Sequence, residues 1–388
     1  MEINLLKFNK SIRENKAYLF WLAYILYMAE LLFFESMYGE MESLQLFFML
    51  ARNISYILVC TKVLLDFFYN EYGKKELVLI ILGTILLLIV AKMAKNKSLL
   101  IYWTFIVAAH DVDLEKIVKA SLLIHFFCMF IIIASSIGNV VEDRMYYQDT
   151  VRERASLGYQ YTTDSSNYFF HMLLMYIYTK KEKISWESIG VLGLCNVLLF
   201  KLTDTRSAFL LGCLVLVVTG IWKAIPGLRK GYLLYKGGAV LAMPVMSGLM
   251  MYLTFFYDEQ KTWMGHLNEL INGRLLLGYT AFKTYGLHLL GQPIQWIGGA
   301  QSYVESPGVY NYVDSSYIQI ILNYGILIFG LVCFLFIALG KKAAKKGDIY
   351  LMLVLVIIAL HSAIDPQLLW MACNPFLMCF LYLKKEFK

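Results

Sequence analysis

Long apolar runs, separated by short charged or Gly/Pro-containing segments, repeat along almost the whole chain. A helix needs about 20 mostly apolar residues to cross the hydrocarbon layer of a membrane. The runs predict about twelve transmembrane helices (11–13), at 17–35, 43–61, 77–91, 99–109, 118–137, 165–179, 187–202, 207–222, 232–256, 315–339, 349–364 and 367–383. The run at 99–109 is too short to cross alone, so it predicts a partial or re-entrant helix.

The composition agrees with this pattern. Of 388 residues, 59% are hydrophobic and only 16% are charged, whereas an ordinary soluble domain has about 25% charged residues. A soluble single-core fold is therefore excluded. The predicted helices use most of the chain and leave only loops, so we expect a single integral membrane domain over residues 1–388, all-α in class.

The distribution of charge predicts the orientation. With both termini in the cytoplasm, the inner segments hold 23 Lys and Arg residues and the outer segments hold 10. The opposite orientation would violate the positive-inside rule. The net charge of +7 then reflects membrane orientation, and no nucleic-acid partner is expected.

Two predicted outer loops are long enough to carry chemistry, at 139–164 and at 257–313. The second contains an amphipathic helical pattern that is broken at Gly273. Long, partly structured loops on one side of a protein often carry function. We therefore expect one large structured extracytoplasmic loop.

Two arginines are candidates for binding an anion. Arg206 begins the helix after a short outer loop, and Arg274 follows Gly273 inside the large loop. The guanidinium donors suit the oxygens of a pyrophosphate. The structural alternatives are that Arg206 pairs with Asp204 or lies at the membrane interface, and that Arg274 pairs with Glu269.

The large loop also offers two candidate bases. Asp314 precedes Ser315, Ser316 and Tyr317, where the chain returns to the membrane, and its carboxylate can accept a proton from a sugar hydroxyl. The alternative is that Asp314 caps the helix that begins there. His288 is a reserve general base, and Tyr317 is a candidate for substrate contact.

Further arginines could contact a glycan or its diphosphate. Arg144, Arg152 and Arg154 alternate with tyrosines in the first outer loop, although acidic residues of the same loop could pair with them. Arg52 lies in the middle of a predicted helix, where an ionisable group needs a partner or a wet cavity. Pairing with Glu30 on the preceding helix is the structural alternative.

No metal, nucleotide or other cofactor is expected. Asp111 and Asp113 form a DxD pattern, but it lies on the predicted cytoplasmic side before a helix, so capping is the favoured interpretation. The seven cysteines lie inside apolar runs without a CxxC pair. No phosphate-binding glycine loop, HExxH or Ser-His-Asp arrangement occurs.

Four short motifs resemble those of the Wzy-type polymerases of O-antigen and capsular polysaccharide, within the superfamily that includes the O-antigen ligases. They are Thr203-Asp-Thr-Arg-Ser-Ala-Phe209, Asn272-Gly-Arg274, Leu289-Leu-Gly-Gln-Pro293, and Asp314-Ser-Ser-Tyr317 followed by Asn323-Tyr-Gly325. The resemblance implies a GT-C-like fold and engagement of the lipid pyrophosphate by Arg206 and Arg274. Ligases usually have a His-Asn element where this chain has Asp314-Ser315, and this difference favours a polymerase. The general base is then either Asp314 or His288.

The resemblance implies an inverting, metal-independent glycosyltransferase that polymerises undecaprenyl-pyrophosphate-linked repeat units at the outer face of a bacterial plasma membrane. Lipid-linked oligosaccharide would be donor and acceptor, bilayer lipid would be a partner, and a chain-length regulator stays an open alternative. The rival readings are an O-antigen-type ligase and, from another class, a lipid-linked oligosaccharide flippase or other transporter.

Overall fold

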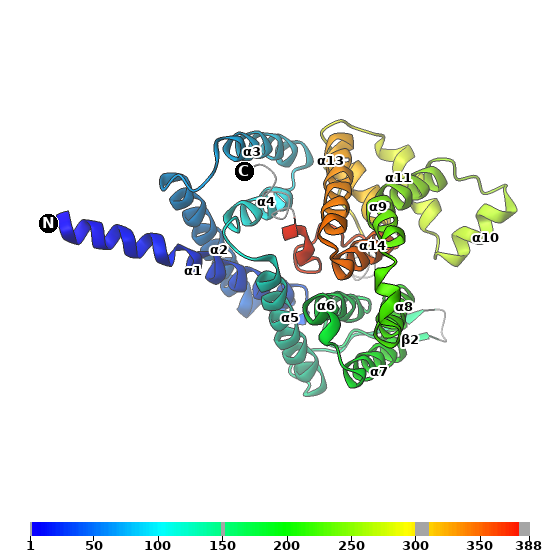
Figure 1. The fold of residues 1–388 in the computed structure, drawn as a ribbon. Helices are drawn as coiled ribbons and strands as arrows, with labels where there is room; N and C mark the ends of the chain where they lie inside the picture. Colours follow the sequence, from blue (N-terminus) through cyan, green and yellow to red (C-terminus); the bar gives the residue numbers. More distant parts are fainter. Residues whose placement is uncertain (1, 149–151, 299–309, 380–388) are drawn as a thin grey trace. The chain divides into compact units, whose positions relative to one another are not determined.

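The computed structural model of the chain describes residues 2–148, 152–298 and 310–379 (Figure 1). Side chains are described from residue 15 onward, except at 147–148, 152, 232–234 and 379. The chain forms two compact units. Unit 1 comprises Met1–Leu88, Lys97–Gln160 and Pro375–Lys388, and unit 2 comprises Ile89–Asn96 and Tyr161–Asn374.

Unit 1 is built mainly from helices at the start of the chain. They are α1 (Glu2–Phe34), η1 (Met37–Glu40), α2 (Glu42–Phe68), α3 (Lys74–Ala94), α4 (Ser98–Ala108) and α5 (Leu114–Ile137), with η4 (Pro375–Cys379) from the end. Helix α1 packs against α2 and α5. The buried hydroxyl of Tyr24 lies 2.7 Å from that of Ser121, which joins α1 to α5.

Unit 2 holds the remaining helices. They are α6 (Asp164–Lys180), η2 (Lys181–Lys183), α7 (Trp186–Thr203), α8 (Arg206–Ala224), η3 (Pro226–Lys230), α9 (Tyr232–Phe255), α10 (Thr262–Leu270), α11 (Arg274–Tyr285), α13 (Ser316–Lys346) and α14 (Ile349–Ile364). Helix α9 packs against α13 and α14, while α6 packs against α7, α8 and α14. Most of α6 is buried, including its first residues after Asp164. Polar residues at the start of α6 are therefore held inside unit 2.

Eight helices are long and apolar enough to cross a membrane among the described residues: α1, α2, α3, α5, α7, α8, α9 and α13. Their exposed surface is rich in Leu, Ile, Val and Phe, because a helix in lipid hides its backbone hydrogen bonds and turns apolar side chains outward. The chain is thus an all-α multi-pass membrane protein. Helices α4 and α14 are apolar but have only 11 and 16 residues.

Eleven of the twelve predicted runs form helices, but the twelfth, at 367–383, is wrong in its described part. Residues 366–374 form turns, and the only regular element after them that is described is the short 3-10 helix η4. Pro375 lies inside this run, and a proline in a helix interior removes a backbone hydrogen bond and kinks or breaks the helix. Residues 380–383 lie outside the described part. The count of twelve spans is therefore not confirmed.

The two long connections have their own structure. The predicted helical break in the second is confirmed: Gly273 separates α10 from α11 with a φ of 78°, a conformation that favours glycine. The side-chain oxygen of Asn268 accepts from the amides of Leu275 and Leu276 and so caps α11. The first connection contains an unpredicted antiparallel hairpin of β1 (Met145–Gln148) and β2 (Arg152–Ala155).

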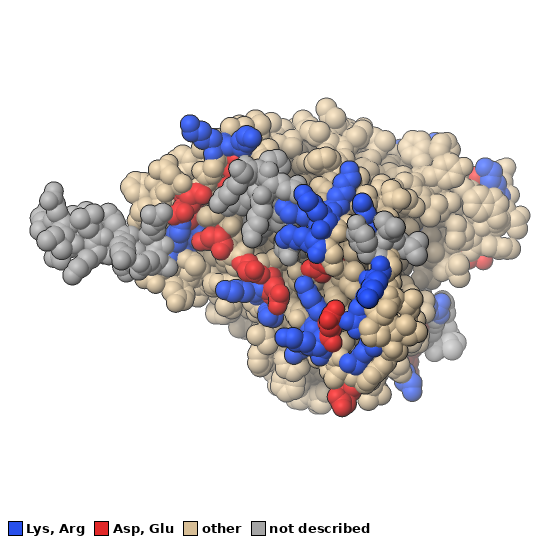
Figure 2. Space-filling model, in the orientation of Figure 1, with Lys and Arg blue, Asp and Glu red and all other residues tan. Residues whose placement is uncertain are grey.

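One end of unit 2 is strongly basic. Figure 2 shows Lys and Arg side chains gathered on one face, over α6, α8, α13 and α14. A cavity of about 670 Å³ on this side is lined by Lys181, Arg229, Lys230 and Lys346, together with Glu182 and Asp348. Here α6, α8 and α13 end and α14 begins. Helix α14 begins here and has 16 residues, so its other end lies about 24 Å from this basic end.

Candidate functional site

The end of unit 2 at which α13 begins carries a partly exposed ion pair. Arg274, the first residue of α11, places its Nε 3.4 Å from Oδ2 of Asp314, just before α13. The side chains are 17% and 29% exposed respectively, so a ligand can reach them. The structural alternative paired Arg274 with Glu269, whereas the partner that the structure shows is Asp314.

Apolar packing brings these two residues together. Ala281 and Phe282 of α11 lie in one core cluster with Val313 and with residues of α13, Ile318 among them. The helix that starts with Arg274 is thereby fixed against the chain that carries Asp314. The pair depends on this packing, since the two residues are 40 positions apart.

Asp314 does not act as the predicted helix cap. Ser315 occupies the N-cap position of α13 and makes no side-chain capping bond. Instead, Ser316 donates from its amide and its hydroxyl to the backbone oxygen of Asp365, at 3.2 and 2.6 Å. This contact ties the start of α13 to the end of α14 and leaves the Asp314 carboxylate available to Arg274.

Asp365 is a functional candidate that the sequence interpretation missed. Its side chain is nearly fully buried, and its Oδ2 accepts a hydrogen bond of 3.0 Å from the amide of Asn167 in α6. Nε2 of His361, one helical turn earlier, lies 3.8 Å from the same oxygen. The other oxygen, Oδ1, has no hydrogen-bond partner within the described part of the chain. The available signal was an Asp-Pro step after an apolar run, with a histidine four residues before it.

Both carboxyl groups are shifted toward the protonated form. Burial raises the pKa of Asp365 to about 7, and the nearby charge of Asp314 adds to the rise, although Arg274 and the hydrogen bond from Asn167 oppose it. Burial also raises the pKa of Asp314, against the opposing charge of Arg274. With a pKa near 7, the Asp365 carboxyl can exchange a proton near neutral pH.

Arg206 lies at the start of α8. Its side chain is 55% exposed and its Nε lies 3.8 Å from Asp204, a loose pair in solvent that contributes little to stability. The first turn of α6 links the two arginine regions: Ser166 contacts Thr203 at the end of α7, and the next residue, Asn167, contacts Asp365. Both guanidiniums stand at helix N-termini, where the helix dipole also favours an anion.

His288 is not joined to the Arg274–Asp314 pair by any contact described for this region. Its side chain is exposed, whereas its backbone oxygen accepts from the amide of Ile326 at 3.0 Å. The backbone oxygen of Leu289 likewise accepts from Leu327 at 3.2 Å. Helix α13 is interrupted at Gly325, whose φ and ψ are 87° and 171°. The interruption leaves backbone amides without a partner inside the helix, and these two carbonyl oxygens accept their hydrogen bonds.

The segment 286–292 thus crosses α13 at its interruption, and it brings two sequence motifs into backbone contact. A Cβ on Gly325 would lie 2.5 Å from the amide nitrogen of Gly291, and a Cβ on Gly291 would overlap the backbone oxygen of Asn323. Trp296 adds a 3.1 Å hydrogen bond from Nε1 to the Asn323 side chain. The motifs Leu289–Pro293 and Asn323–Gly325 therefore fix the position of the connection rather than carry reactive groups.

Tyr317 is buried, and its hydroxyl donates to the backbone oxygen of Ala359 at 2.6 Å. This bond holds α13 to α14. The ring is therefore not presented to a sugar as the sequence interpretation supposed.

The predicted substrate residues of unit 1 have structural partners. Arg52 forms an ion pair with Glu30, with Nε 3.0 Å from Oε1, and stacks over Phe34. Arg144 donates from Nη1 to Glu40 at 2.8 Å and lies 3.3 Å from Glu142. The structure shows the pairing alternative for Arg52. For Arg144 it shows one partner from the same loop, Glu142, and a closer one from outside it, Glu40.

The other two arginines of the first connection lie on the hairpin. Arg154 faces Tyr146 across the strands and makes further interactions. The side chain of Arg152 lies outside the described part of the chain.

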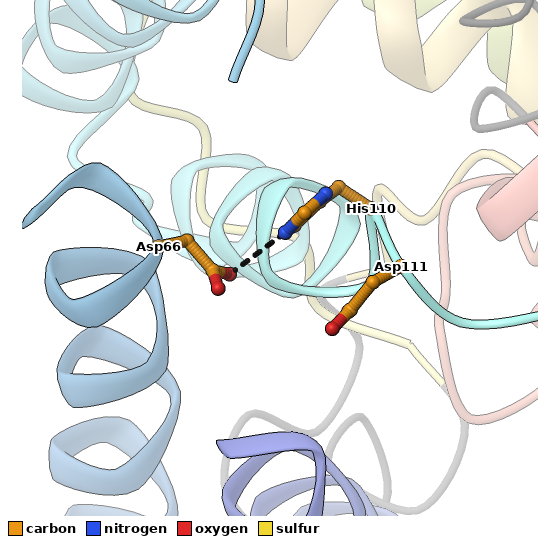
Figure 3. Close-up of side chains that lie close together, drawn as sticks. All are labelled: Asp66, His110 and Asp111. Atoms are coloured by element: carbon orange, nitrogen blue, oxygen red, sulfur yellow. Dashed lines mark ion pairs between the residues drawn. The ribbon is translucent and has the colours of Figure 1, made fainter. Parts of the chain in front are cut away.

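A group of possible metal ligands lies in unit 1, where Asp66, His110 and Asp111 approach one another (Figure 3). Nε2 of His110 is 3.1 Å from Asp66. However, the ammonium of Lys62 contacts both Asp66 and Asp111, and Lys16 lies 2.8 Å from Asp66. Two lysines already supply the positive charge that a metal ion would bring, so the group is better described as a buried ion-pair network.

The capping interpretation of the DxD pattern is confirmed for one of its two residues. Oδ1 of Asp113 accepts from the amide of Glu115 at 2.7 Å at the start of α5. Asp111 instead pairs with Lys62 at 3.1 Å.

Comparisons of the chain with protein-family models, with curated proteins and with solved structures found no match.

Proposed function

We propose that this protein is a Wzy-type polymerase that joins lipid-linked oligosaccharide repeat units at the outer face of a bacterial plasma membrane. The observation that carries the proposal is the accessible Arg274–Asp314 pair, which combines a cation for a departing diphosphate with a carboxylate of raised pKa. It lies in an all-α membrane protein, at a helix end where a polyprenyl-linked headgroup would arrive.

The proposed reaction is an inverting glycosyl transfer. The acceptor hydroxyl oxygen attacks the anomeric carbon of the donor glycan, and the bond from that carbon to the diphosphate oxygen breaks. The electron pair of that bond leaves with the diphosphate, which Arg274 and Arg206 stabilise. The hydroxyl proton passes to the carboxylate of Asp314.

Substrate binding would itself prepare the base. In the free protein Arg274 holds Asp314 in an ion pair and lowers its proton affinity. When a diphosphate engages the guanidinium, the hold on Asp314 weakens and its carboxylate becomes more basic. The single pair would thus serve both the leaving group and the acceptor.

The charge distribution supports the proposed orientation. The end of unit 2 opposite to this pair carries Lys181, Arg229, Lys230 and Lys346. Under the positive-inside rule such an end faces the cytoplasm. The Arg274–Asp314 pair would then face outward, with both termini inside.

Purified protein in lipid nanodiscs, supplied only with the lipid-diphosphate repeat unit, tests the activity. Arg274→Ala and Arg206→Ala should each reduce chain lengthening by about 100-fold, since loss of one transition-state donor typically costs that much. Arg229→Ala removes the same charge at the opposite end, where Arg229 pairs with Glu182 at 3.0 Å, and should polymerise normally. Normal polymer lengths in both test variants would refute the proposed site.

The rival functions give different results. A ligase defect leaves finished polymer on the carrier lipid, whereas a polymerase defect leaves single repeat units. A flippase cannot lengthen a glycan in detergent. Transporters do use interrupted helices, but the amides freed at Gly325 are already bonded by the carbonyls of His288 and Leu289, which gives a transported ion or substrate no free backbone donor there.

A further inference from the structure

The positive charge of Arg274 is placed close to two carboxyl groups, not one. Asp314 is in direct contact at 3.4 Å, and Asp365 lies near enough for the charges of both Arg274 and Asp314 to act on it. One guanidinium can neutralise only one of the two carboxylates. If both were ionised, the site would carry a net charge of about −1 where the proposed substrate is itself an anion.

The surroundings of Asp365 suit a neutral carboxyl group. An ionised carboxylate has about four lone-pair positions to satisfy, yet the described part of the chain supplies one hydrogen-bond donor, the amide of Asn167, to Oδ2. Oδ1 is buried and has no hydrogen-bond partner among the residues that the structure describes. His361 is 3.8 Å away, beyond hydrogen-bond length.

The groups around Asp365 come from four elements. Helix α6 contributes Asn167 and His171, whose ring lies 5.3 Å from that of His361 in α14. Helix α11 contributes Arg274, and the segment before α13 contributes Asp314. Tyr312 of the same segment is also near, since the charges of Asp314 and Asp365 both act on it. Its pKa is raised, mainly by burial and further by these two carboxylates. Among these groups Arg274 is the single permanent cation.

We propose that Asp365 is a positioning residue whose protonated state is required for a diphosphate to bind at Arg274. With Asp365 neutral, the Arg274–Asp314 pair has no net charge and its guanidinium can turn to the ligand. With Asp365 ionised, the extra negative charge repels the diphosphate and competes for the guanidinium. The inference rests on the proposed function, since it takes the lipid diphosphate as the ligand of Arg274.

The pH range in which the diphosphate should bind follows from the pKa of the Asp365 carboxyl. Burial is the main reason that the pKa of Asp365 is raised to about 7. Binding should therefore be constant below that pH and weaken by about tenfold for each pH unit above it, because each unit reduces the protonated fraction tenfold.

The test measures binding of a polyprenyl diphospho-N-acetylglucosamine to the full chain in nanodiscs from pH 5 to pH 9. This probe is substituted at both ends of the diphosphate, so it has no terminal phosphate group that titrates in the range. The wild-type protein should lose affinity above about pH 7. The Asp365→Asn variant, which mimics the neutral acid and keeps an acceptor for Asn167, should bind at pH 9 as tightly as the wild type at pH 6.

Asp258→Asn is the matched control, because this partly exposed aspartate accepts from the amide of Gln260 at 3.1 Å and lies 3.7 Å from the ammonium of Lys261. It should keep the wild-type pH profile. If Asp365→Asn does not fold, Asn167→Ala provides a second test. Loss of the donor that stabilises the ionised carboxylate raises the pKa of Asp365, so the pH limit should move upward. An unchanged limit in Asn167→Ala, or the same alkaline loss in Asp365→Asn, would overturn the proposal.

The two proposals can fail separately. If the pH limit and its removal in Asp365→Asn are observed but no glycan is lengthened, the polymerase proposal fails and the diphosphate site stands. If glycan is lengthened but binding does not depend on pH in the wild type, the role of Asp365 is refuted alone.

Discussion

Replacing Gly325 by alanine should destabilise the protein far more than replacing Gly330, a second glycine of α13, by alanine. Gly325 has φ 87° and ψ 171°, a region that is almost restricted to glycine. A Cβ there would also lie 2.5 Å from the backbone oxygen of Leu289 and 2.6 Å from its carbonyl carbon. Relief of this overlap requires the crossing segment to move away from α13.

The expected cost follows from two contributions. Holding an L-residue in this backbone region costs about 1–3 kcal/mol. Displacing the segment breaks the hydrogen bonds from Ile326 to His288 and from Leu327 to Leu289, each worth about 1 kcal/mol. The sum is about 3–5 kcal/mol. For a unit of this size such a loss lowers the unfolding midpoint by roughly 10 °C.

Thermal unfolding of the detergent-purified protein measures this effect. Gly330→Ala is the matched control, since it lies five residues further along the same helix, where an added Cβ would meet nothing within 4 Å. There the alanine should leave the midpoint unchanged or raise it slightly, because alanine favours a helix. Equal midpoints for the two variants would show that the interruption at Gly325 does not anchor the segment.

Two further substitutions test unit 1. Arg52→Ala should lower stability by about 2 kcal/mol, because it leaves the carboxylate of Glu30, 1% exposed, without its cation. The double variant with Glu30→Gln should recover part of the decrease in the unfolding midpoint, and no recovery would contradict the ion-pair argument. Asp113→Ala should cost about 1 kcal/mol through loss of the cap on Glu115, measured as a lower unfolding midpoint, and an unchanged midpoint would show that this cap does not contribute.

The local features of the fold followed from local sequence. A long apolar run in lipid must satisfy its own backbone hydrogen bonds, so a helix is the available structure. Eleven of the predicted runs form helices, and eight of these helices are long and apolar enough to cross a membrane. Gly273 and Asp113 were also interpreted correctly, because a glycine break and a helix cap act within a few residues. The run at 367–383 was misjudged because its apolar content was weighed above the proline in its interior, Pro375.

The candidate site was predicted only in part. Arg274 and Asp314 were both selected from the sequence, but their contact was not, and Asp365 was not selected at all. Tyr317 and Arg144 were expected to meet a substrate, yet Tyr317 bonds a backbone oxygen and Arg144 bonds Glu40. Residue type shows what a side chain can bind, whereas the partner present in the fold decides what it does bind.

The sequence alone therefore determined that the chain is a helical membrane protein and where most of its helices lie, because hydrophobic length and backbone satisfaction are properties of short segments. Only the tertiary structure decided which charges meet. Arg274 and Asp314 are 40 positions apart and Asn167 and Asp365 are 198 apart. Their contacts exist because α6, α11, α13 and α14 pack at one end of unit 2, and burial there, rather than residue type, changes the proton affinity of the carboxyl groups.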